Sequence, residues 1–246
     1  MAYQPEVPYC LRIAQGGVSG VISENKFGRN PDVDVGTEDI WSQGGMWVAP
    51  TAACVHAIVS SSANDASAGT GARTISVTGL NGSYAITTET VTLNGTTPVN
   101  TANSYVIIHR MLVLTCGTGG TNAGTITATA SSGGTVSIGM VIGKGQSQFC
   151  IYQIPAGYTA YLTKYICSTN AGPSSHVDVE LFAKPFGGCF NLKGTITLDT
   201  DGVSSDVREY LVPLQFTEKT IIKLTATTDT NNCNVVGSFD LIMVAN

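Results

Sequence analysis

The sequence predicts an all-β protein, an antiparallel β-sandwich of the jelly-roll type with an extended N-terminal arm. Three observations predict this class: few charged residues, short apolar segments of alternating polarity, and turn residues between them. Charged residues are 12% of the 246 residues, about half the roughly 25% of an average globular protein. Exposed helix faces are normally filled by Lys, Glu, Arg and Gln, and the stretch from Met111 to Gly143 contains no charged side chain. Hydrophobic residues are 43% of the chain, enough for a substantial core.

Alternating apolar residues predict about a dozen short strands after residue 50. Asn81-Gly82 and Asn94-Gly95 predict tight hairpins, because Asn and Gly tolerate the positive φ of a type I′ turn. A spacing of roughly 8–14 residues is typical of a sandwich or barrel, and two facing sheets of a jelly roll would bury the alternating positions. The predicted strands are Ala57–Ser60, Thr74–Thr78, Thr87–Leu93, Ser104–Leu114, Thr125–Thr129, Thr135–Ile142, Phe149–Ile154, Ala160–Cys167, Val177–Lys184, Phe190–Thr197, Val207–Leu214, Thr220–Thr227 and Ser238–Val244.

Residues 1–48 differ from the rest, and we interpret them as an anchoring arm followed by one sandwich domain at 49–246. The segment is rich in Gly and Pro, carries a local cluster of charge and shows no sustained apolar period. It nevertheless contains both tryptophans of the chain, which a disordered tail would not be expected to carry. Extended structure docked on a neighbouring protein explains this combination. The predicted anchor residues are Phe27, Arg29, Asp32, Asp34, Ile40, Trp41 and Trp47.

The charge distribution argues against nucleic-acid and membrane partners. The net charge is −5, and the 12 Lys and Arg residues are scattered singly instead of forming the basic stripe that binds phosphates. No apolar run reaches the roughly 18–20 residues of a membrane-spanning helix. The N-terminal residues lack the basic and apolar regions of a secretory signal, so we expect neither export nor membrane insertion.

The 7 cysteines are expected to be mostly buried free thiols of a protein made in a reducing compartment. Their number is odd, their spacing is wide and no Cys-x-x-Cys pair occurs. Zinc sites normally pair ligands roughly two to four residues apart, and disulfide scaffolds are short and cysteine-dense. We therefore predict no metal site and no cofactor.

The residues needed for catalysis form no recognisable motif, and we expect no enzymatic activity. A nucleophilic hydrolase needs a Ser or Cys beside a His, but no Gly-x-Ser-x-Gly elbow is present. We interpret His56, His109 and His176 as residues on the polar faces of strands. A glycosidase needs two carboxylates flanking one bond; Asp178 and Glu180 share a strand face, which does not place them across a cleft.

Two loops carry some of the residues of an ion or phosphate site, but neither has the complete pattern. Asp199-Thr200-Asp201-Gly202 carries the oxygen ligands that calcium prefers, but it lacks the glutamate and spacing of an EF-hand loop, so we interpret it as a solvated turn. Gly143-Lys144-Gly145 lacks the strand-to-helix context of a phosphate-binding loop.

Glycan contact is considered for Tyr158 and Tyr161, which lie close together in the sequence among small and polar residues. Tyrosines at strand ends also pack the edge of a core, which is the alternative interpretation of this pair. We assign Trp41 and Trp47 to the arm.

Most of the chain resembles a known family. The run from Gly20 to Asp34 (GVISENKFGRNPDVD), followed by TEDIW at 37–41, is similar to the N-terminal signature of structural proteins of tailed bacteriophages, marine and cyanophage podoviruses among them. Segments 77–82, 90–96, 121–126 and 154–162 agree with it. The resemblance implies a virion component synthesised in the host cytoplasm, and it carries over no catalytic residue.

We therefore expect a non-enzymatic virion structural protein, a head decoration, knob or fibre-type subunit attached to the capsid through its N-terminal arm. The alternative is a tail-associated subunit that binds a host surface glycan. A glycan depolymerase is a third hypothesis, which requires a carboxylate pair within a cleft. The expected partners are the major capsid protein or tail proteins and further copies of the chain, with a homotrimer as one option.

Overall fold

The computed structural model describes residues 7–170, 175–199 and 201–246. Within these residues the chain forms antiparallel strands and one six-residue helix, which confirms the all-β prediction. The elements are α1 (Tyr9–Ala14), β1 (Val21–Val33), β2 (Gly36–Asp39), β3 (His56–Ser60), β4 (Ala72–Leu80), β5 (Ile86–Thr92), β6 (Val99–Asn100), β7 (Ile107–Cys116), β8 (Ile126–Ala130), β9 (Val136–Met140), β10 (Ile151–Gln153), β11 (Tyr158–Asn170), β12 (His176–Lys184), β13 (Asn191–Asp199), β14 (Ser205–Phe216), β15 (Ile221–Thr228) and β16 (Cys233–Ala245).

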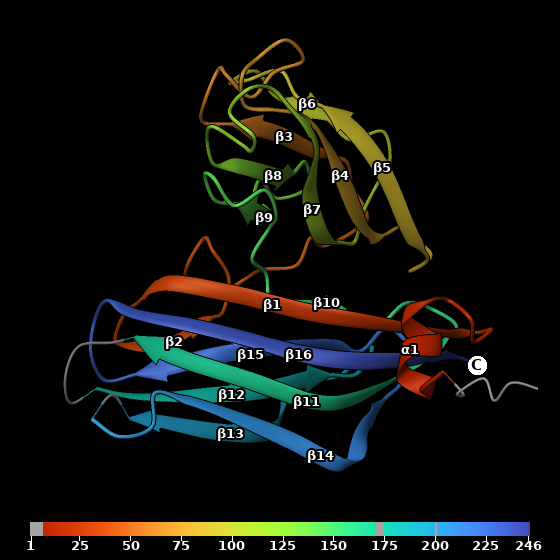
Figure 1. Cartoon of the computed structure of the whole chain (residues 1–246), viewed down its shortest axis with the longest axis vertical. Helices are drawn as coiled ribbons and strands as arrows, with labels where there is room; N and C mark the ends of the chain where they lie inside the picture. Colours follow the sequence, from red (N-terminus) through yellow and green to blue (C-terminus); the bar gives the residue numbers. More distant parts are fainter. Residues whose placement is uncertain (1–6, 171–174, 200) are drawn as a thin grey trace, which may run out of the picture.

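The strands of the described residues form four antiparallel sheets in two lobes (Figure 1). The base lobe contains the sheets β1-β16-β11-β14 and β10-β15-β12-β13, with β2 added beside β15. The inserted lobe contains the sheets β6-β3-β8-β9 and β5-β4-β7. The chain leaves the base lobe after β2 and returns at β10, so the inserted lobe interrupts the base lobe.

Each lobe is built around a hydrophobic core of its own. In the base lobe the core lies between the two sheets, and alternation places one face of each strand inward, as in β12 with Val177, Val179, Leu181 and Ala183. The inserted lobe buries the inward residues of β3, β4, β7, β8 and β9 in the same way. Each large aliphatic or aromatic side chain buried in this manner contributes roughly 1.5–3 kcal/mol.

Each strand predicted from alternation overlaps an observed strand, but the hairpin predictions were only half right. A hairpin joins β4 to β5 as expected, but its loop spans residues 81–85 with the positive φ at Tyr84, so the predicted type I′ turn at Asn81-Gly82 is wrong. The Asn81 side-chain oxygen accepts hydrogen bonds from the backbone of Ser83 and Ala85. Asn94-Gly95 does not form a hairpin, because β5 and β6 belong to different sheets. Gly95 instead turns the chain against the segment at Ala63, with a φ of 61°.

β1 was not predicted, and its inward residues explain why. Three buried positions of this strand are Lys26, Gly28 and Asn30, which give no apolar alternation. The two polar side chains among them bond to groups outside β1: Lys26 Nζ donates to the His109 carbonyl, and Asn30 Nδ2 donates to Glu38 and to the Asp39 carbonyl. Sequence alternation detects apolar burial, and therefore does not detect a strand whose inward face is polar.

The predicted arm at 1–48 and single domain at 49–246 are wrong for the described residues. β1 pairs along its length with β16, so residues 21–33 belong to the base lobe. Ile40, Trp41 and Trp47 are at most 8% exposed and lie within the cores of their own chain. These three are therefore core residues and not anchors to another protein. The two tryptophans fill the junction between the two lobes.

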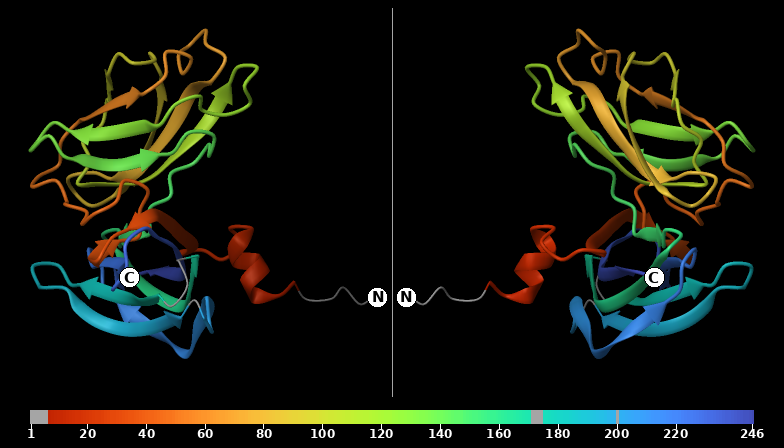
Figure 2. Two further views of the ribbon diagram at one scale, coloured as in Figure 1. Left: turned by 90° about the vertical axis from the view of Figure 1, so that its left-hand side faces the viewer. Right: turned by 90° about the vertical axis from the view of Figure 1, so that its right-hand side faces the viewer.

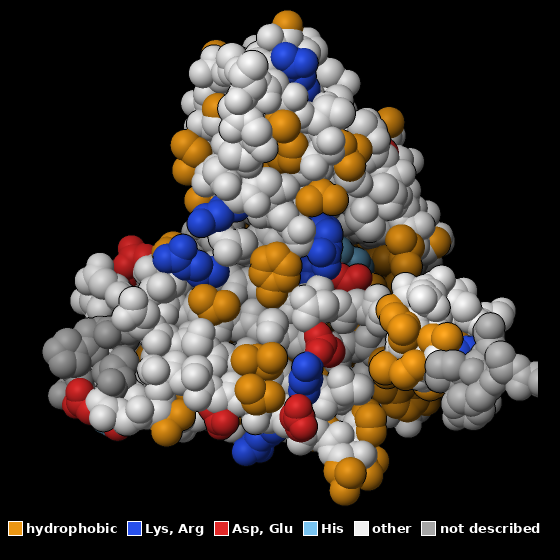
Figure 3. All heavy atoms as spheres, in the orientation of Figure 1, with side chains coloured by type: hydrophobic (Ala, Val, Ile, Leu, Met, Phe, Trp, Pro, Cys, Tyr) orange, Lys and Arg blue, Asp and Glu red, His pale blue; other side chains and the backbone are white. Residues whose placement is uncertain are grey.

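The described part of the chain before β1 does project from the body. Figure 2 shows α1 standing to one side of the base lobe, and Val7, Tyr9 and Leu11 are exposed on it, whereas Ile13 is buried. Charged side chains are few and dispersed on the face shown in Figure 3. No helix among the described residues has the length and apolar character needed to cross a membrane.

The long loop between β3 and β4 is fixed by the buried carboxylate of Asp65. Its two oxygens accept hydrogen bonds from the backbone of Ala72, Ala123 and Gly124 and from the Ser60 hydroxyl, at 2.6–2.8 Å. Several donors of the inserted lobe thus converge on one side chain, which is fully buried. Hydrogen bonds to a charged acceptor are stronger than neutral ones, so this loop is held firmly.

We expect Asp65→Ala to lower the free energy of unfolding by roughly 3–5 kcal/mol, because it leaves several buried donors without a partner. Urea denaturation followed by far-UV circular dichroism measures the loss. Asp32→Ala, at an exposed carboxylate, is the matched control and should change stability by less than about 0.5 kcal/mol. Equal stability of the two variants would contradict the assignment.

Candidate functional site

The two lobes meet where two segments of the chain cross between them. Trp41 and Phe149 form an isolated antiparallel bridge, and the Cys150 amide donates to the Ile40 carbonyl at 3.1 Å. Gly28 of β1 lies directly beneath this crossing. A Cβ at that position would overlap the Ile40 carbonyl oxygen and the Cys150 backbone nitrogen, so only glycine allows the crossing to approach.

A buried ion pair holds the segment that leaves the base lobe after β2. Lys223 Nζ of β15 lies 2.7 Å from Asp39 Oδ1 at the end of β2, and both side chains are almost completely buried. Asp39 Oδ2 accepts a hydrogen bond from the Trp47 amide at 2.7 Å. Burial raises the pKa of Asp39, and the neighbouring Lys223 ammonium opposes that rise. The pair therefore ties the connecting segment to the base lobe through groups that are costly to bury singly.

A second polar cluster joins β1 to β7 of the inserted lobe. Lys26 donates to the His109 carbonyl, and Arg110 pairs with Glu24. Burial lowers the pKa of Lys26 to about 8, and it lowers the pKa of His109 well below its ordinary value. His109 Nε2 accepts a hydrogen bond from the backbone amide of Gln153, which requires the neutral imidazole.

The interpretation of His56 and His109 as polar-face residues is wrong, because both are buried. Neutral imidazoles fit these sites because their nitrogens have protein partners. His56 Nε2 lies 2.9 Å from the Ser137 hydroxyl. Burial lowers the pKa of His56. His176 is exposed at the start of β12, as expected, with Nδ1 3.7 Å from Asp199 Oδ2.

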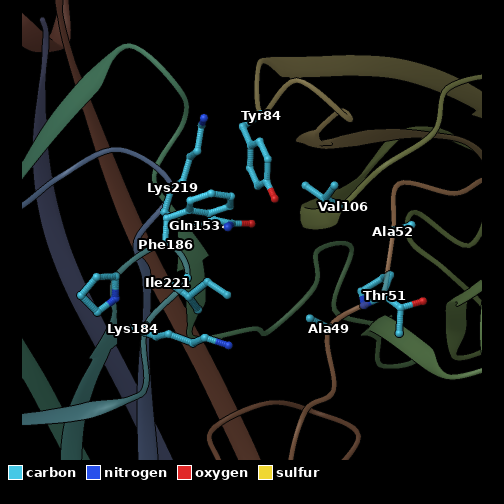
Figure 4. A pocket seen from close by; sticks show the side chains of 14 residues that line it. Ala49, Thr51, Ala52, Tyr84, Val106, Gln153, Lys184, Phe186, Lys219 and Ile221 are labelled. Atoms are coloured by element: carbon cyan, nitrogen blue, oxygen red, sulfur yellow. Dashed lines mark hydrogen bonds between the residues drawn. The ribbon is translucent and has the colours of Figure 1, made fainter.

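A cleft of about 310 Å³ opens beside this junction (Figure 4). One wall comes from the connecting segment 49–52 and from Tyr84 and Val106 of the inserted lobe. The opposite wall comes from the base lobe, through Gln153 of β10, the segment 184–188 after β12, and residues 219 and 221 beside β15. The cleft is the candidate functional site, since concave sites of this size between domains are a common location for small ligands.

Aromatic rings and ammonium groups line the cleft. Tyr84 and Phe186 meet edge to face with ring centroids 5.6 Å apart. Lys219 Nζ lies 5.2 Å from the centroid of each ring, and 4.0 Å from Glu218 Oε1. Lys184 points its ammonium group toward the cleft (Figure 4) and pairs with no carboxylate of the described residues.

Backbone strain is concentrated at this cleft. Tyr84 and Lys219 adopt φ values of 63° and 62°, a left-handed conformation that side chains rarely take, and only Asn232 shares it among the described residues other than glycine. The Tyr84 carbonyl accepts from the Ala156 amide, and the Lys219 amide donates to the Ile154 carbonyl. Both strained residues are thus held by the same segment between β10 and β11.

The other predicted anchor residues lie on or beside β1 and are not gathered into one surface. Phe27 is half-buried, and its carbonyl accepts the Phe149 amide. Arg29 donates to Asn234 Oδ1 at 2.7 Å, while Asp32 and Asp34 are exposed. Sequence reasoning missed the cleft itself, because its residues come from six distant segments.

The two tyrosines proposed for glycan contact do not form a common platform. Tyr158 packs against the base core, and Tyr161, three residues later on β11, faces the opposite side of the sheet. Whether either residue contacts a glycan stays a prediction.

The thiols and acidic groups have simple surroundings in the described structure. All 7 cysteines are free, but only Cys150, Cys167 and Cys233 are buried, so the expectation of burial holds for a minority. No group of three His, Cys, Asp or Glu side chains in the described ranges is arranged to hold a metal. In the loop predicted as a solvated turn, Asp199 Oδ1 accepts the Asp201 amide, and Thr200 lies outside the described residues.

No family model matches the chain, and no curated protein sequence matches it. Similar solved structures include the crystal structure of the infectious bursal disease virus VP2 subviral particle, with a TM-score of 0.25 and 11% identity over 92% of this chain and 72% of that one. A structure of the Gt strain of the same virus has a TM-score of 0.19 and 10% identity over 98% and 83%. The likeness is weak, is to proteins of virus particles, and does not establish a common fold.

We expect the stability of the wild type relative to Lys26→Met to increase by about 3 kcal/mol between pH 8 and pH 10.5. Below pH 8 both the folded and unfolded wild type carry the Lys26 charge, so its burial costs stability in full. As the pH rises to 10.5, the folded protein loses this proton before the unfolded chain does, which stabilises the wild type. Methionine does not titrate. Urea denaturation of both proteins under reducing conditions measures the difference, and a difference independent of pH would show that Lys26 is not desolvated.

Proposed function

We propose that the chain is a non-enzymatic structural subunit of a bacteriophage particle, a head decoration, knob or fibre-type protein whose base lobe is a jelly roll. The strand order carries this proposal. When the eight strands β1 and β10–β16 are lettered B to I in chain order, the two sheets of the base lobe read B-I-D-G and C-H-E-F. Jelly rolls of this kind are widespread in viral capsid proteins. The inserted lobe then stands on the base as a projection between strands B and C.

The exposed apolar residues support attachment through one end of the base lobe. Opposite the single residue Thr163, β14 carries four residues, 210–213, that bulge from the sheet. Leu211 in this bulge is fully exposed and Val212 is 79% exposed. Figure 3 shows hydrophobic side chains gathered at the end of the base lobe where α1 and this bend of β14 lie. Exposed apolar groups of this kind mark interaction surfaces.

The side-chain chemistry agrees with a structural role. His56 and His109 are buried with their ring nitrogens engaged in the fold, and the Asp39 and Asp65 carboxylates hold backbone amides. The edge strands β13 and β14 remain available for contact with a neighbour, which suits a subunit present in many copies. The proposed partners are other virion proteins and further copies of the chain.

A tail-associated subunit that binds a host glycan is the second candidate. The observation that favours it is the cleft between the lobes, with its aromatic rings and unpaired ammonium group.

Removal of residues 1–17, which include α1, should abolish co-sedimentation of the purified protein with particles of the encoding phage. The base lobe should remain folded, because β1 begins at Val21, and the thermal unfolding temperature should fall by only a few degrees. A Leu211→Ser/Val212→Ser variant probes the apolar bulge separately, and Asp32→Ala serves as the surface control. Undiminished co-sedimentation of both the truncated and the double variant would refute attachment through this end.

Mass spectrometry of purified particles tests the virion assignment directly. The assignment fails if the chain is absent from the particles.

A further inference from the structure

We propose that the cleft between the lobes binds an acidic sugar, a hydroxylated ring that carries a carboxylate. The inference deepens the glycan-binding candidate by naming a site and a ligand class, and it does not depend on the chain being part of a particle. It uses different residues from the tyrosines of β11 considered above.

The first argument is an acceptor without a partner in the described residues, on a mostly buried side chain, that faces the cleft. Gln153 is only 7% exposed, and its amide nitrogen donates to the Lys219 carbonyl at 3.0 Å. Its amide oxygen accepts no hydrogen bond from the described residues and points toward the open space (Figure 4). The Tyr84 hydroxyl projects toward the same space (Figure 4). Both oxygens face the cleft and can exchange hydrogen bonds with what fills it, so these groups suit a ligand that carries hydroxyl groups.

The second argument is charge. The chain has a net charge of −5, yet the titratable groups lining this cleft are Lys184, Lys219 and Tyr84. Lys184 has no carboxylate partner in the described structure, and Glu218 lies 4.0 Å from Lys219 at the rim. Lys223, a buried lysine of β15, is neutralised by Asp39. The Lys184 ammonium, which lies 5.7 Å from the centroid of the Phe190 ring and has no carboxylate partner, is therefore available to an anionic group on the ligand.

The third argument is shape and apolar surface. The cleft volume of about 310 Å³ is at the lower end of the range for small-ligand sites, which fits one sugar ring. The rings of Phe186 and Tyr84 and the side chain of Ile221 line it. Aromatic faces pack against the C–H face of a sugar ring, while an acid without hydroxyl groups would offer the Gln153 oxygen no donor.

The site has walls from both lobes, so a bound sugar would connect them. Tyr84 belongs to the inserted lobe, and Gln153, Lys184 and Phe186 belong to the base lobe. A ligand that binds only the folded protein raises its stability in proportion to the logarithm of ligand concentration. Binding should therefore raise the unfolding temperature as well as give a direct signal.

The experiment measures binding of the full chain to glucuronic acid and to N-acetylneuraminic acid by isothermal titration calorimetry and saturation-transfer NMR. We expect a dissociation constant at or below about 1 mM for at least one of them. Glucose tests the need for the carboxylate, and citrate tests the need for the hydroxylated ring; both should bind at least tenfold more weakly. A tetrasaccharide of alternating glucuronic acid and N-acetylglucosamine distinguishes recognition of a polymer from recognition of a free or terminal sugar.

Two variants assign the binding to this cleft. Lys184→Gln and Phe186→Ala alter exposed or half-exposed side chains, should keep the unfolding temperature of the wild type, and should each weaken binding at least tenfold. Lys144→Gln and Tyr9→Ala, exposed residues of the same types outside the cleft, are the matched controls and should bind as the wild type does. The proposal is overturned if neither acidic sugar binds at 20 mM (about twentyfold above the expected constant), if glucose or citrate binds equally well, or if Lys184→Gln and Phe186→Ala leave the affinity unchanged. Particle association could still hold in each of these cases.

Discussion

The two-lobed arrangement depends on how closely the chain can pass between its lobes. The crossing at Ile40 and Cys150 lies against β1 at a distance that only Gly28 permits, and the ion pair of Asp39 with Lys223 holds the departing segment in place. Trp41 and Trp47 then pack edge to face on Phe149, which fills the space above the crossing. The cleft beside it has its shape because both walls are attached to this one junction.

Buried polar groups specify this junction more than they stabilise it. Removing Lys26 and its charge from water costs free energy, as does burying the polar imidazole of His109, and neither residue would be needed for a simple apolar contact. Lys26 donates to the His109 carbonyl, and the backbone amide of Gln153 donates to the His109 ring. Both bonds can form in only one relative placement of the lobes. We infer that these groups define the angle at which the inserted lobe stands, with packing around Phe149 supplying the stabilisation.

Much of the fold could be predicted from the sequence, because most strands alternate in polarity. β12 is an example, with Val177, Val179 and Leu181 inward and Asp178 and Glu180 outward. β1 could not be predicted in this way, since Lys26, Gly28 and Asn30 occupy its inward positions. The two tryptophans were predicted to pack on a neighbouring protein and instead pack within their own chain, because sequence alone does not say to which chain the surface beneath them belongs. The cleft escaped prediction because its residues meet only in the folded chain.

The insertion between β1 and β10 has a consequence for how the molecule forms. Every strand pairing of the inserted lobe joins residues within 56–140, so this lobe can close soon after it leaves the ribosome. β1 is made first among the strands, yet its pairing partner β16 is made last. Pairings between distant segments are the slowest to form. β1 must therefore wait until β16 has been made, and we expect the polar residues of its inward face to limit aggregation during that delay.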